Sequence, residues 1–146
     1  MNFIANRADI VLLRTQNMGA LYLGSKEALH TEYIKKHNIK AVISFVPHKA
    51  PEGIHQYYFP VQDSRTHCTQ MRRFIPQILR LIHRHRTMGH NVLVHCRAGV
   101  QRAPTTVVLY LQKYYYPLSK AIRLVRFHRP VVFYGGLYYT FRDLLR

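Results

Sequence analysis

Apolar residues along the chain are arranged in two ways, as short continuous runs and as longer stretches with a helical period. Residues 39–46 (IKAVISFV) and 91–95 (NVLVH) are continuous runs rich in β-branched residues, a composition typical of strands buried on both faces of a parallel sheet. Residues 20–25 (ALYLGS) predict a shorter strand followed by a turn. A fourth strand is predicted at 54–62, where Pro60 favours the edge or the end of a sheet.

Stretches with a helical period separate these strands. Over residues 69–88 the apolar side chains recur at steps of three and four, the opposite face is rich in arginine, and Gly89 ends the helix. Strands that alternate with helices predict an α/β fold with a central, largely parallel sheet flanked by helices. Four more helices are predicted: one at 25–34 with Ser25 as its N-cap, one from Pro104 to about 115, one at 118–128 and one at 137–145.

The 146 residues contain no internal repeat and no linker long enough to divide them. Residues 1–18 lack a clear period and are predicted to form an N-terminal arm or a short helix, and residues 19–146 a single domain. No run approaches the roughly 20 uninterrupted apolar residues of a membrane span, and the N-terminus does not resemble a secretory signal. The two cysteines are too few for a disulfide framework, so we expect a reducing, cytoplasmic location, with the nucleus as an alternative.

Basic residues far outnumber acidic ones, with 22 Lys and Arg against six Asp and Glu and a formal net charge of +16. Such a surface attracts polyanions, including RNA, phosphorylated proteins and membranes that carry phosphoinositides. The basic residues are spread along the chain, so the charge indicates general attraction rather than a dedicated nucleic-acid function. The arginine face of the 69–88 helix is interpreted as a solvated face, with docking of an acidic partner as the alternative; it comprises Arg72, Arg73, Arg80 and Arg84.

Residues 95–102 (HCRAGVQR) join a predicted strand to the helix that starts near Pro104, with a thiol near one end and a guanidinium at the other. A loop that leads from a strand into a helix directs backbone N–H groups inward, with the helix dipole behind them, and so binds a tetrahedral oxyanion such as phosphate. These groups and Arg102 would stabilise the thiolate of Cys96, while Gly99 permits the tight turn. The predicted chemistry is attack of the sulfur on phosphorus, which gives a cysteinyl-phosphate.

Two other interpretations of this loop are weaker. As a structural turn it would bury Cys96 as a small apolar side chain, which gives no reason for Cys, Gly and Arg to follow in this order between a strand and a helix. A metal site is disfavoured because no second cysteine lies at ligand spacing, and His83 and His85 point in different directions from a helix. We therefore predict no metal and no cofactor, and interpret Cys68 as an ordinary thiol, with a redox partnership with Cys96 as the alternative.

Dephosphorylation also needs an acid that protonates the leaving oxygen. Asp63 is the one side-chain carboxylate that directly follows a predicted strand, which would place it with Cys96 at the carboxyl edge of a parallel sheet, where such folds carry their sites. We therefore predict Asp63 as the general acid, with capping of a turn or helix as its alternative role. The other carboxylates lie in the arm, in predicted helices or in a loop: Asp9, Glu27, Glu32, Glu52 and Asp143.

The loop HCRAGVQR fits the Cys-x5-Arg signature and resembles the protein tyrosine phosphatase superfamily, with its HCxAGxxR form similar to the dual-specificity branch. The likeness covers roughly residues 20–145, because ALYLGS, IKAVISFV, YYFPVQDS and YLQKYYYPLSKAIRLVRFHRP follow in the order of a small dual-specificity phosphatase domain. The resemblance implies that fold, no cofactor, and a catalytic set of Cys96, Arg102 and Asp63. It also implies a loop supported by His95 and a phosphate-binding surface made of Arg97, Ala98, Gly99, Val100, Gln101 and Arg102.

The same resemblance implies hydrolysis of phosphate monoesters on phosphotyrosine and phosphoserine or phosphothreonine proteins, through a cysteinyl-phosphate intermediate. One position departs from the pattern: the family has Ser or Thr directly after the signature arginine, where this chain has Ala103. In the family that hydroxyl helps the sulfur to leave, so we expect slower turnover here unless Thr105 or Thr106 compensates. A weakly active module that binds phosphorylated ligands is therefore an alternative function.

The basic composition and Arg97 in the loop also favour a second alternative, a phosphatase of RNA 5′ ends or of phosphoinositides. RNA-directed relatives carry HCTHGxNR, and lipid-directed ones have a second basic residue near the position of Val100, features that this loop lacks. The expected partners are phosphorylated proteins, with contact to RNA or phosphoinositides through the basic surface as an alternative. The sequence leaves the oligomeric state open.

Overall fold

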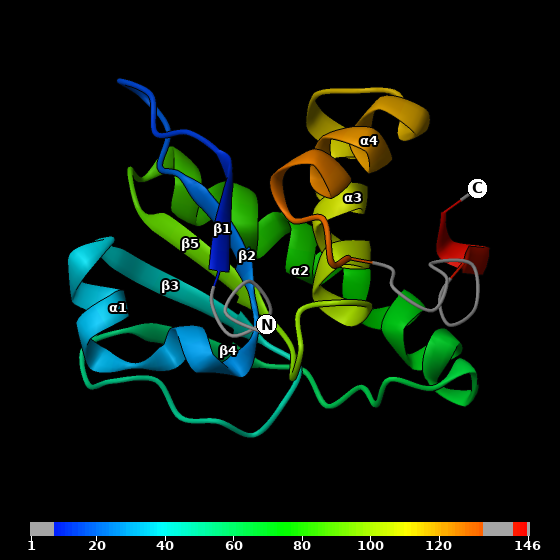
Figure 1. Ribbon diagram of the computed structural model, residues 1–146, viewed down its shortest axis with the longest axis horizontal. Coiled ribbons are helices and arrows are strands. Elements are labelled where there is room, and N and C mark those ends of the chain that lie inside the picture. The colour runs from blue at the N-terminus through cyan, green and yellow to red at the C-terminus, as the bar shows by residue number, and fades with distance from the viewer. Residues whose placement is uncertain (1–7, 133–141, 146) are drawn as a thin grey trace.

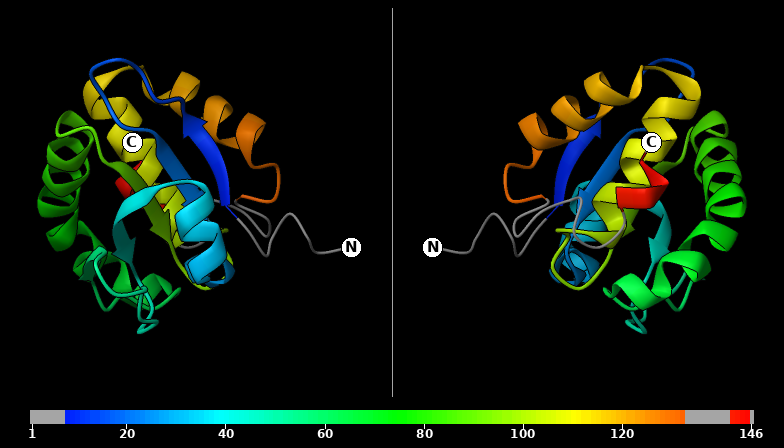
Figure 2. Two further views of the ribbon diagram at one scale, coloured as in Figure 1. Left: turned by 90° about the vertical axis from the view of Figure 1, so that its left-hand side faces the viewer. Right: turned by 90° about the vertical axis from the view of Figure 1, so that its right-hand side faces the viewer.

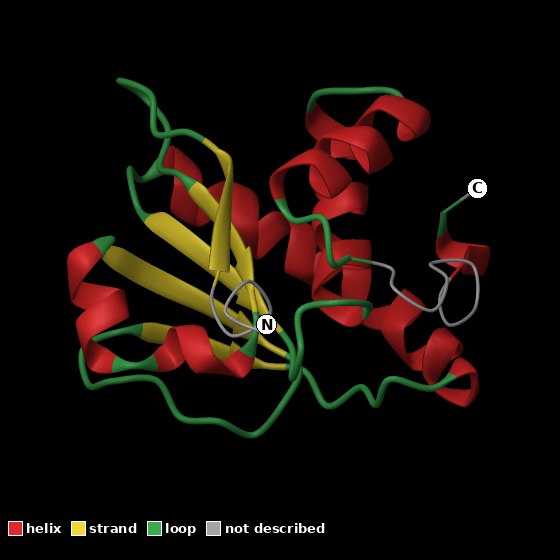
Figure 3. Cartoon of the chain, viewed as in Figure 1, coloured by secondary structure: helices red, strands yellow, loops and turns green. Residues whose placement is uncertain are grey.

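The computed structural model describes residues 8–132 and 142–145. These residues form one twisted sheet with helices packed against it (Figure 3). The strands are β1 (Ala8–Leu12), β2 (Leu21–Gly24), β3 (Ile39–Ser44), β4 (His55–Tyr58) and β5 (Asn91–His95). Their order across the sheet is β1-β2-β5-β3-β4, with β1 antiparallel to β2 and the other neighbours parallel.

Helices form two layers, one on each face of the sheet (Figure 1). The layers consist of η1 (Lys26–Leu29), α1 (Thr31–Lys36), α2 (Cys68–Thr87), α3 (Arg102–Tyr114) and α4 (Leu118–His128), with the short 3₁₀ turns η2 (Arg65–His67) and η3 (Arg142–Leu144) beside them. Val92 and Val94 of β5 pack with α2, α3 and α4 in the larger core, whereas Leu93 packs with η1 and α1 in the smaller one. A strand buried on both faces needs apolar residues at every position, which explains the continuous apolar run in the sequence.

The predicted fold class, a largely parallel α/β sheet flanked by helices, is confirmed. The strongest predicted strands, within 39–46 and at 91–95, are the two at the centre of the parallel part of the sheet. The helix predicted at 118–128 is present at those residues, and Gly89 follows α2 with a φ of 83°, in the left-handed region that favours glycine. Within the described part of the chain, no helix is long and apolar enough to cross a membrane.

Two predicted helices differ from the structure. The 25–34 segment is interrupted at His30, so that it forms the 3₁₀ turn η1 and then the separate helix α1. Ser25 caps η1 as expected, because its side chain accepts a hydrogen bond from the Glu27 N–H. The helix predicted at 137–145 lies largely outside the described residues, and its described part, 142–144, is a 3₁₀ turn.

The N-terminal segment corrects a prediction, because residues 8–12 are a strand rather than an arm or a helix. β1 pairs with β2 at the edge of the sheet, and α4 lies beside it (Figure 2). A bulge between Ile10 and Leu12 shifts the register of β1. Such a bulge breaks the alternation by which a strand is recognised in a sequence. For residues 1–7, which lie outside the described part of the chain, the arm stays a prediction.

The parallel strands end in register at one edge of the sheet. Their last residues, paired from strand to strand, are Gly24 of β2, His95 of β5, Ser44 of β3 and Tyr58 of β4. Segments that follow these strands therefore start side by side. This is the edge at which parallel sheets carry their sites.

Candidate active site

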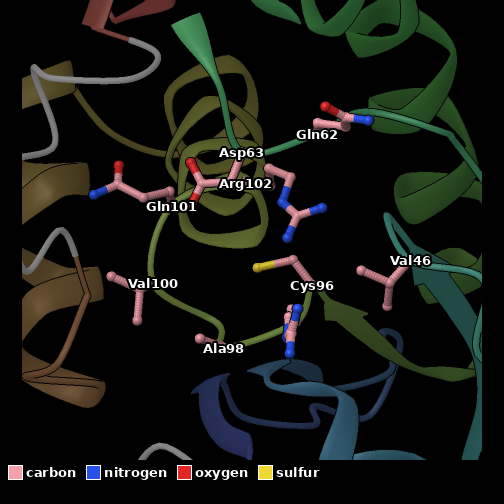
Figure 4. Close-up of a pocket in the computed structure, with 9 residues that line it drawn as sticks. Val46, Gln62, Asp63, Cys96, Ala98, Val100, Gln101 and Arg102 are labelled. Atoms are coloured by element: carbon pink, nitrogen blue, oxygen red, sulfur yellow. The ribbon is translucent and has the colours of Figure 1, made fainter.

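A pocket of about 370 Å³ opens at this edge of the sheet (Figure 4). Three separate segments line it: the chain after β3, the chain before η2, and the loop between β5 and α3. The pocket thus brings together Cys96, Arg102 and Asp63, the residues predicted to be catalytic. The residues that line it are Val46, Gln62, Asp63, Cys96, Arg97, Ala98, Val100, Gln101 and Arg102.

Cys96 is the first residue after β5, and its sulfur points into the space between the lining residues (Figure 4). Its backbone N–H donates to the Gly24 carbonyl oxygen at 3.4 Å, which extends the pairing of β2 and β5 by one residue. The residue is only 2% exposed. The sheet therefore fixes the position of the sulfur, and a ligand reaches it through the pocket.

Three successive carbonyl groups of the loop between β5 and α3 are hydrogen-bonded to residues that do not line the pocket. The Arg97 carbonyl oxygen accepts a hydrogen bond from the Lys26 N–H at 3.1 Å. The carbonyl oxygens of Ala98 and Gly99 accept from the Arg129 guanidinium at 3.0 and 3.1 Å. In a trans peptide the N–H of the next residue points opposite to the carbonyl, and the described chain has no cis peptide. The amides that follow these carbonyls therefore point toward the pocket, an arrangement that binds oxyanions.

Gly99 is not among the residues that line the pocket, and its place on the phosphate-binding surface stays a prediction. Its φ of 70° lies in the left-handed region, which side chains disfavour. A Cβ at this position would lie 2.7 Å from Arg129 Nη2 and 2.7 Å from the carbonyl group of Gly24. A larger residue would therefore push the loop away from β2, so Gly99 lets the loop lie close against this strand.

Arg102 is the first residue of α3 and is 8% exposed. Its Nη1 donates to the carbonyl oxygens of Phe45 at 3.3 Å and Val61 at 2.8 Å, which fixes the orientation of the guanidinium plane. Its Nε has no hydrogen-bond partner among the described residues. Leaving a buried donor unpaired costs about 1–3 kcal/mol, and an oxyanion in the pocket that accepts from Nε would remove this cost.

Asp63 reaches the pocket from an irregular segment rather than from the end of a strand, because β4 ends at Tyr58 and not at 62. Val61 anchors this segment, since its side chain is buried and its carbonyl accepts from Arg102. The position of Asp63 is thereby tied to that of the guanidinium. The capping role considered for Asp63 falls instead to Ser64, which is the N-cap of η2.

His95 lies fully buried directly before Cys96. Its Nε2 is hydrogen-bonded to the Ser44 hydroxyl, which also accepts from Gln56 Nε2 at 2.8 Å. Gln56 Oε1 accepts in turn from the Ala50 N–H at 2.8 Å. Burial is the main reason why the pKa of His95 is lowered to about 4, so the ring is neutral near pH 7. A network of neutral groups thus connects the start of the loop to the chain after β3, and the supporting role of His95 stays a prediction.

A sequence profile of the family described as "Dual specificity phosphatase, catalytic domain" matches residues 21–139, which is most of the chain. The chain belongs to this family. The matched residues include all of the parallel strands and the loop that carries Cys96 and Arg102.

Named relatives agree with the family assignment. The chain is 32% identical to human dual specificity protein phosphatase 22 over 94 residues, which are 62% of this chain and 50% of the relative. It is 33% identical to rat dual specificity protein phosphatase 5 over 118 residues, 77% of this chain and 30% of the relative. The chain therefore spans about half of the first relative's length and less of the second's.

The fold has a solved counterpart in the crystal structure of DUSP15. The two structures superpose with a TM-score of 0.78 at 24% sequence identity, over 96% of this chain and 85% of the other. At this level of identity the similarity establishes the fold alone. The arrangement of strands and helices in Figure 1 is therefore the fold of that structure.

This dual-specificity phosphatase domain has no hydroxyl directly after Arg102, and the nearby threonines do not supply one. Ala103 is fully buried in the first turn of α3. The hydroxyl groups of Thr105 and Thr106 donate to the carbonyl oxygens of Gln101 at 2.7 Å and Arg102 at 3.0 Å. Their protons are committed to the helix backbone, so neither threonine compensates for Ala103 in this arrangement.

Three residues that shape the site escaped prediction: Ser44, Asp9 and Arg129. Ser44 had a signal in the sequence, since it is a hydroxyl within the apolar run 39–46. Asp9 and Arg129 had none, because they form a pair over a separation of 120 residues. Arg129 is one of 22 basic residues, and nothing in its sequence neighbourhood marks it as fully buried.

Proposed function

We propose that this domain is a phosphatase that hydrolyses phosphate monoesters of phosphotyrosine and of phosphoserine or phosphothreonine in proteins. The observation that carries the proposal is the meeting of Cys96, Arg102 and Asp63 in one pocket, although they come from separate segments. The relatives named above are dual specificity protein phosphatases, which favours phosphorylated proteins as substrates.

Substrate binding in this proposal uses donors that are already in place. The backbone N–H groups of Ala98, Gly99 and Val100 donate to the phosphoryl oxygens, because the carbonyl groups before them face away from the pocket. Nε of Arg102 donates to the same oxygens. Donors that need no rearrangement stabilise the charge of the transition state at little cost.

The first chemical step transfers the phosphoryl group to Cys96. The thiolate sulfur gives its electron pair to phosphorus, the S–P bond forms, and the P–O bond to the substrate breaks in line with it. The carboxyl group of Asp63 gives its proton to the leaving oxygen, which departs as a hydroxyl of Tyr, Ser or Thr. The product of this step is a cysteinyl-phosphate and an Asp63 carboxylate.

The second step returns the enzyme to its starting state. A water molecule attacks phosphorus and gives a proton to the Asp63 carboxylate, while the S–P bond breaks and its electron pair returns to the Cys96 sulfur. The products are inorganic phosphate and the thiolate. Ala103 offers no hydroxyl to the departing sulfur, so we expect this step to limit the rate and the cysteinyl-phosphate to accumulate.

The same observation favours a second candidate, a module that binds phosphorylated ligands and hydrolyses them hardly at all. Binding requires the loop and Arg102 but not a fast second step. The two candidates differ in whether wild-type protein turns over more substrate than a variant without the thiol.

Polyanion contact through the basic surface is a weaker part of the proposal. The four arginines of the predicted solvated face of α2 are all exposed: Arg72, Arg73, Arg80 and Arg84. Their charge favours acidic partners in general and does not select among them. A reducing, cytoplasmic location would keep the Cys96 thiol intact and is proposed on that ground.

The deciding experiment measures hydrolysis of an aryl phosphate by the wild type and by Cys96→Ser. We expect steady turnover by the wild type, preceded by a burst of one product equivalent, and none by Cys96→Ser. Cys68→Ser is the matched control, because it removes the other thiol, which is half-buried at the start of α2. Wild-type turnover no higher than that of Cys96→Ser, with phosphate binding intact, would establish the binding module instead.

The substrate class is tested with three kinds of phosphate in parallel: phosphopeptides, phosphoinositides and RNA with a 5′-triphosphate. The proposal expects the highest kcat/KM on phosphopeptides, and expects Cys96→Ser to retain phosphorylated proteins in a pull-down. Preferential hydrolysis of RNA or lipid would replace proteins as the substrate class and leave the chemistry in place.

A further inference from the structure

A half-buried ion pair lies behind the phosphate-binding loop and uses residues outside the pocket. Arg129, directly after α4, is fully buried. Its Nη1 donates to the Asp9 carboxylate of β1 at 2.9 Å. Its Nε donates to the Gly99 carbonyl oxygen at 3.1 Å and its Nη2 to the Ala98 carbonyl oxygen at 3.0 Å. One guanidinium therefore joins the edge strand to two successive peptides of the loop.

These contacts determine which way the loop peptides face. Because the carbonyl groups of Ala98 and Gly99 are held on the side of Arg129, the N–H groups of Gly99 and Val100 point the other way, toward the pocket. If either peptide turned over, a carbonyl oxygen would face the phosphate and repel it. The orientation of two phosphate donors thus depends on a residue that does not line the pocket.

We propose that Arg129 and Asp9 are positioning residues that set the affinity of the loop for the phosphoryl group. The proposal rests on the proposed function only in taking phosphate as the ligand of the loop. Asp9 lies outside residues 21–139, the part of the chain that matches the family profile. The acid half of the pair is therefore a feature of this chain that the family assignment does not cover.

The geometry requires an arginine at position 129. A guanidinium presents several N–H groups in one rigid plane, whereas an ammonium group is a single point that cannot bond two carbonyls and a carboxylate in these directions. Asp9 supplies the negative charge that a buried cation needs. Its side chain is 33% exposed, so the pair is accessible to solvent at the β1 edge of the sheet. A Cβ on Gly99 would lie only 2.7 Å from Arg129 Nη2, so guanidinium and loop fit closely.

A purely structural role would predict a different result. In that case the pair only fastens β1 and α4 to the sheet, and removing it lowers the melting temperature without changing phosphate binding by folded protein. The experiment therefore measures binding well below the melting temperature of each variant.

The test measures how strongly inorganic phosphate protects Cys96 from alkylation by iodoacetamide, in Arg129→Lys and Asp9→Asn. We expect Arg129→Lys to weaken phosphate binding about 10-fold to 100-fold, the effect of displacing binding groups on the order of 1 Å. Asp9→Asn should weaken it less and in the same direction, because the guanidinium keeps its carbonyl partners. Arg123→Lys, an exposed substitution on α4, is the matched control and should bind phosphate like the wild type.

The proposal is overturned if folded Arg129→Lys and Asp9→Asn are protected at the same phosphate concentration as the wild type. Should Arg129→Lys fail to fold, Asp9→Asn decides, since it retains the volume of the side chain and an acceptor oxygen. A wild type that binds phosphate without hydrolysing esters would refute the proposed phosphatase function and leave this inference standing. A wild type that does not bind phosphate would refute both.

Discussion

Two buried arginines lie at opposite ends of the parallel strands and are held in different ways. Arg129, at the end that carries the pocket, has a carboxylate partner in Asp9. Arg86, at the other end, is 2% exposed and is held by neutral groups. Its Nε donates to the Gly19 carbonyl oxygen at 2.7 Å, and its Nη1 donates to the hydroxyl groups of two tyrosines at 2.9 and 2.7 Å, those of Tyr110 and Tyr115.

The difference lies in what each arginine holds in place. Arg86 joins the chain before β2 to α2 and α3, and its guanidinium also lies 5.6 Å from the ring centroids of Tyr110 and Tyr115. Burial raises the pKa of Tyr110, so its hydroxyl stays protonated as a neutral partner. These contacts are all within the scaffold. The contacts of Arg129 end on peptides whose other side faces the pocket, so the same residue type stabilises the fold at one end and orients ligand donors at the other.

The largest effect is expected at the pocket end, from Arg102→Lys. Lysine has no guanidinium group, so the variant lacks the Nε donor. We expect kcat/KM for an aryl phosphate to fall by about 10²–10³, the effect of removing one transition-state donor. Steady-state kinetics of folded protein give this value. A loss of less than about threefold would mean that Arg102 does not contact the phosphoryl group.

Arg86→Met should have its effect on stability instead. The variant leaves the Gly19 carbonyl without its side-chain donor, while the Tyr110 hydroxyl loses Arg86 and keeps His83 Nδ1 at 2.9 Å, so the free energy of unfolding should fall by about 1–3 kcal/mol. Urea unfolding measures this change, and Arg84→Met, an exposed substitution on α2, should stay within about 0.5 kcal/mol of the wild type. A selective loss of kcat/KM in folded Arg86→Met would show that the two ends are coupled.

Each end also buries a histidine, which predicts a loss of stability in acid. Burial lowers the pKa of His95 to about 4, and burial together with His90, His55 and Arg84 lowers that of His85 to about 4, both from 6.5. Between pH 6.5 and about pH 4 these histidines are protonated in the unfolded chain but not in the folded one. The free energy of unfolding therefore falls as the pH drops through this range, and their contribution stays constant below about pH 4.

Two variants test whether His95 and His85, at opposite ends of the parallel strands, cause this loss of stability in acid. Urea unfolding over this pH range should give a shallower loss for His85→Gln and for His95→Gln than for the wild type. Only His95→Gln should also lower kcat/KM, because His95 adjoins Cys96 and bonds to Ser44. An unchanged pH dependence in both variants would contradict the assignment.

The smallest effect is expected from Ala103→Ser, which adds a hydroxyl next to the signature arginine. One net hydrogen bond to the departing sulfur, worth about 0.5–1.5 kcal/mol, corresponds to an increase of about 2-fold to 12-fold in kcat. The increase should appear in the steady state and not in the burst, since the added group acts on the second step. An equal increase in both phases would place the effect elsewhere.

The sequence predicts correctly the parts of the molecule whose structure follows from the order of neighbouring residues. The central strands and α2 follow from apolar periodicity, and the loop from Cys96 to Arg102 from the order of its residues. Asp63 was placed correctly at the pocket although β4 ends earlier than predicted, because a buried residue at Val61 keeps the chain at the sheet edge.

The parts that escaped prediction depend on contacts between distant segments. β1 was not recognised because its bulge conceals the strand pattern, and Asp9 was set aside as part of an arm for the same reason. The close contact of Gly99 with Gly24 and Arg129, which leaves no room for a Cβ, likewise depends on segments far away in the sequence. Periodicity reports which face of one element is buried, and it holds no information on which polar groups meet across the fold.

The pairing of β1 with β2 has a practical consequence for anyone who trims the chain to residues 21–139, the span that matches the family profile. Such a fragment keeps the thiol, the guanidinium and the acid of the pocket, yet it loses the carboxylate that neutralises Arg129. It also exposes the unpaired backbone N–H and C=O groups at the edge of β2, which can pair with a strand of another molecule and cause aggregation. Insolubility or feeble catalysis in that fragment would reflect where it was cut rather than a defect in its chemistry.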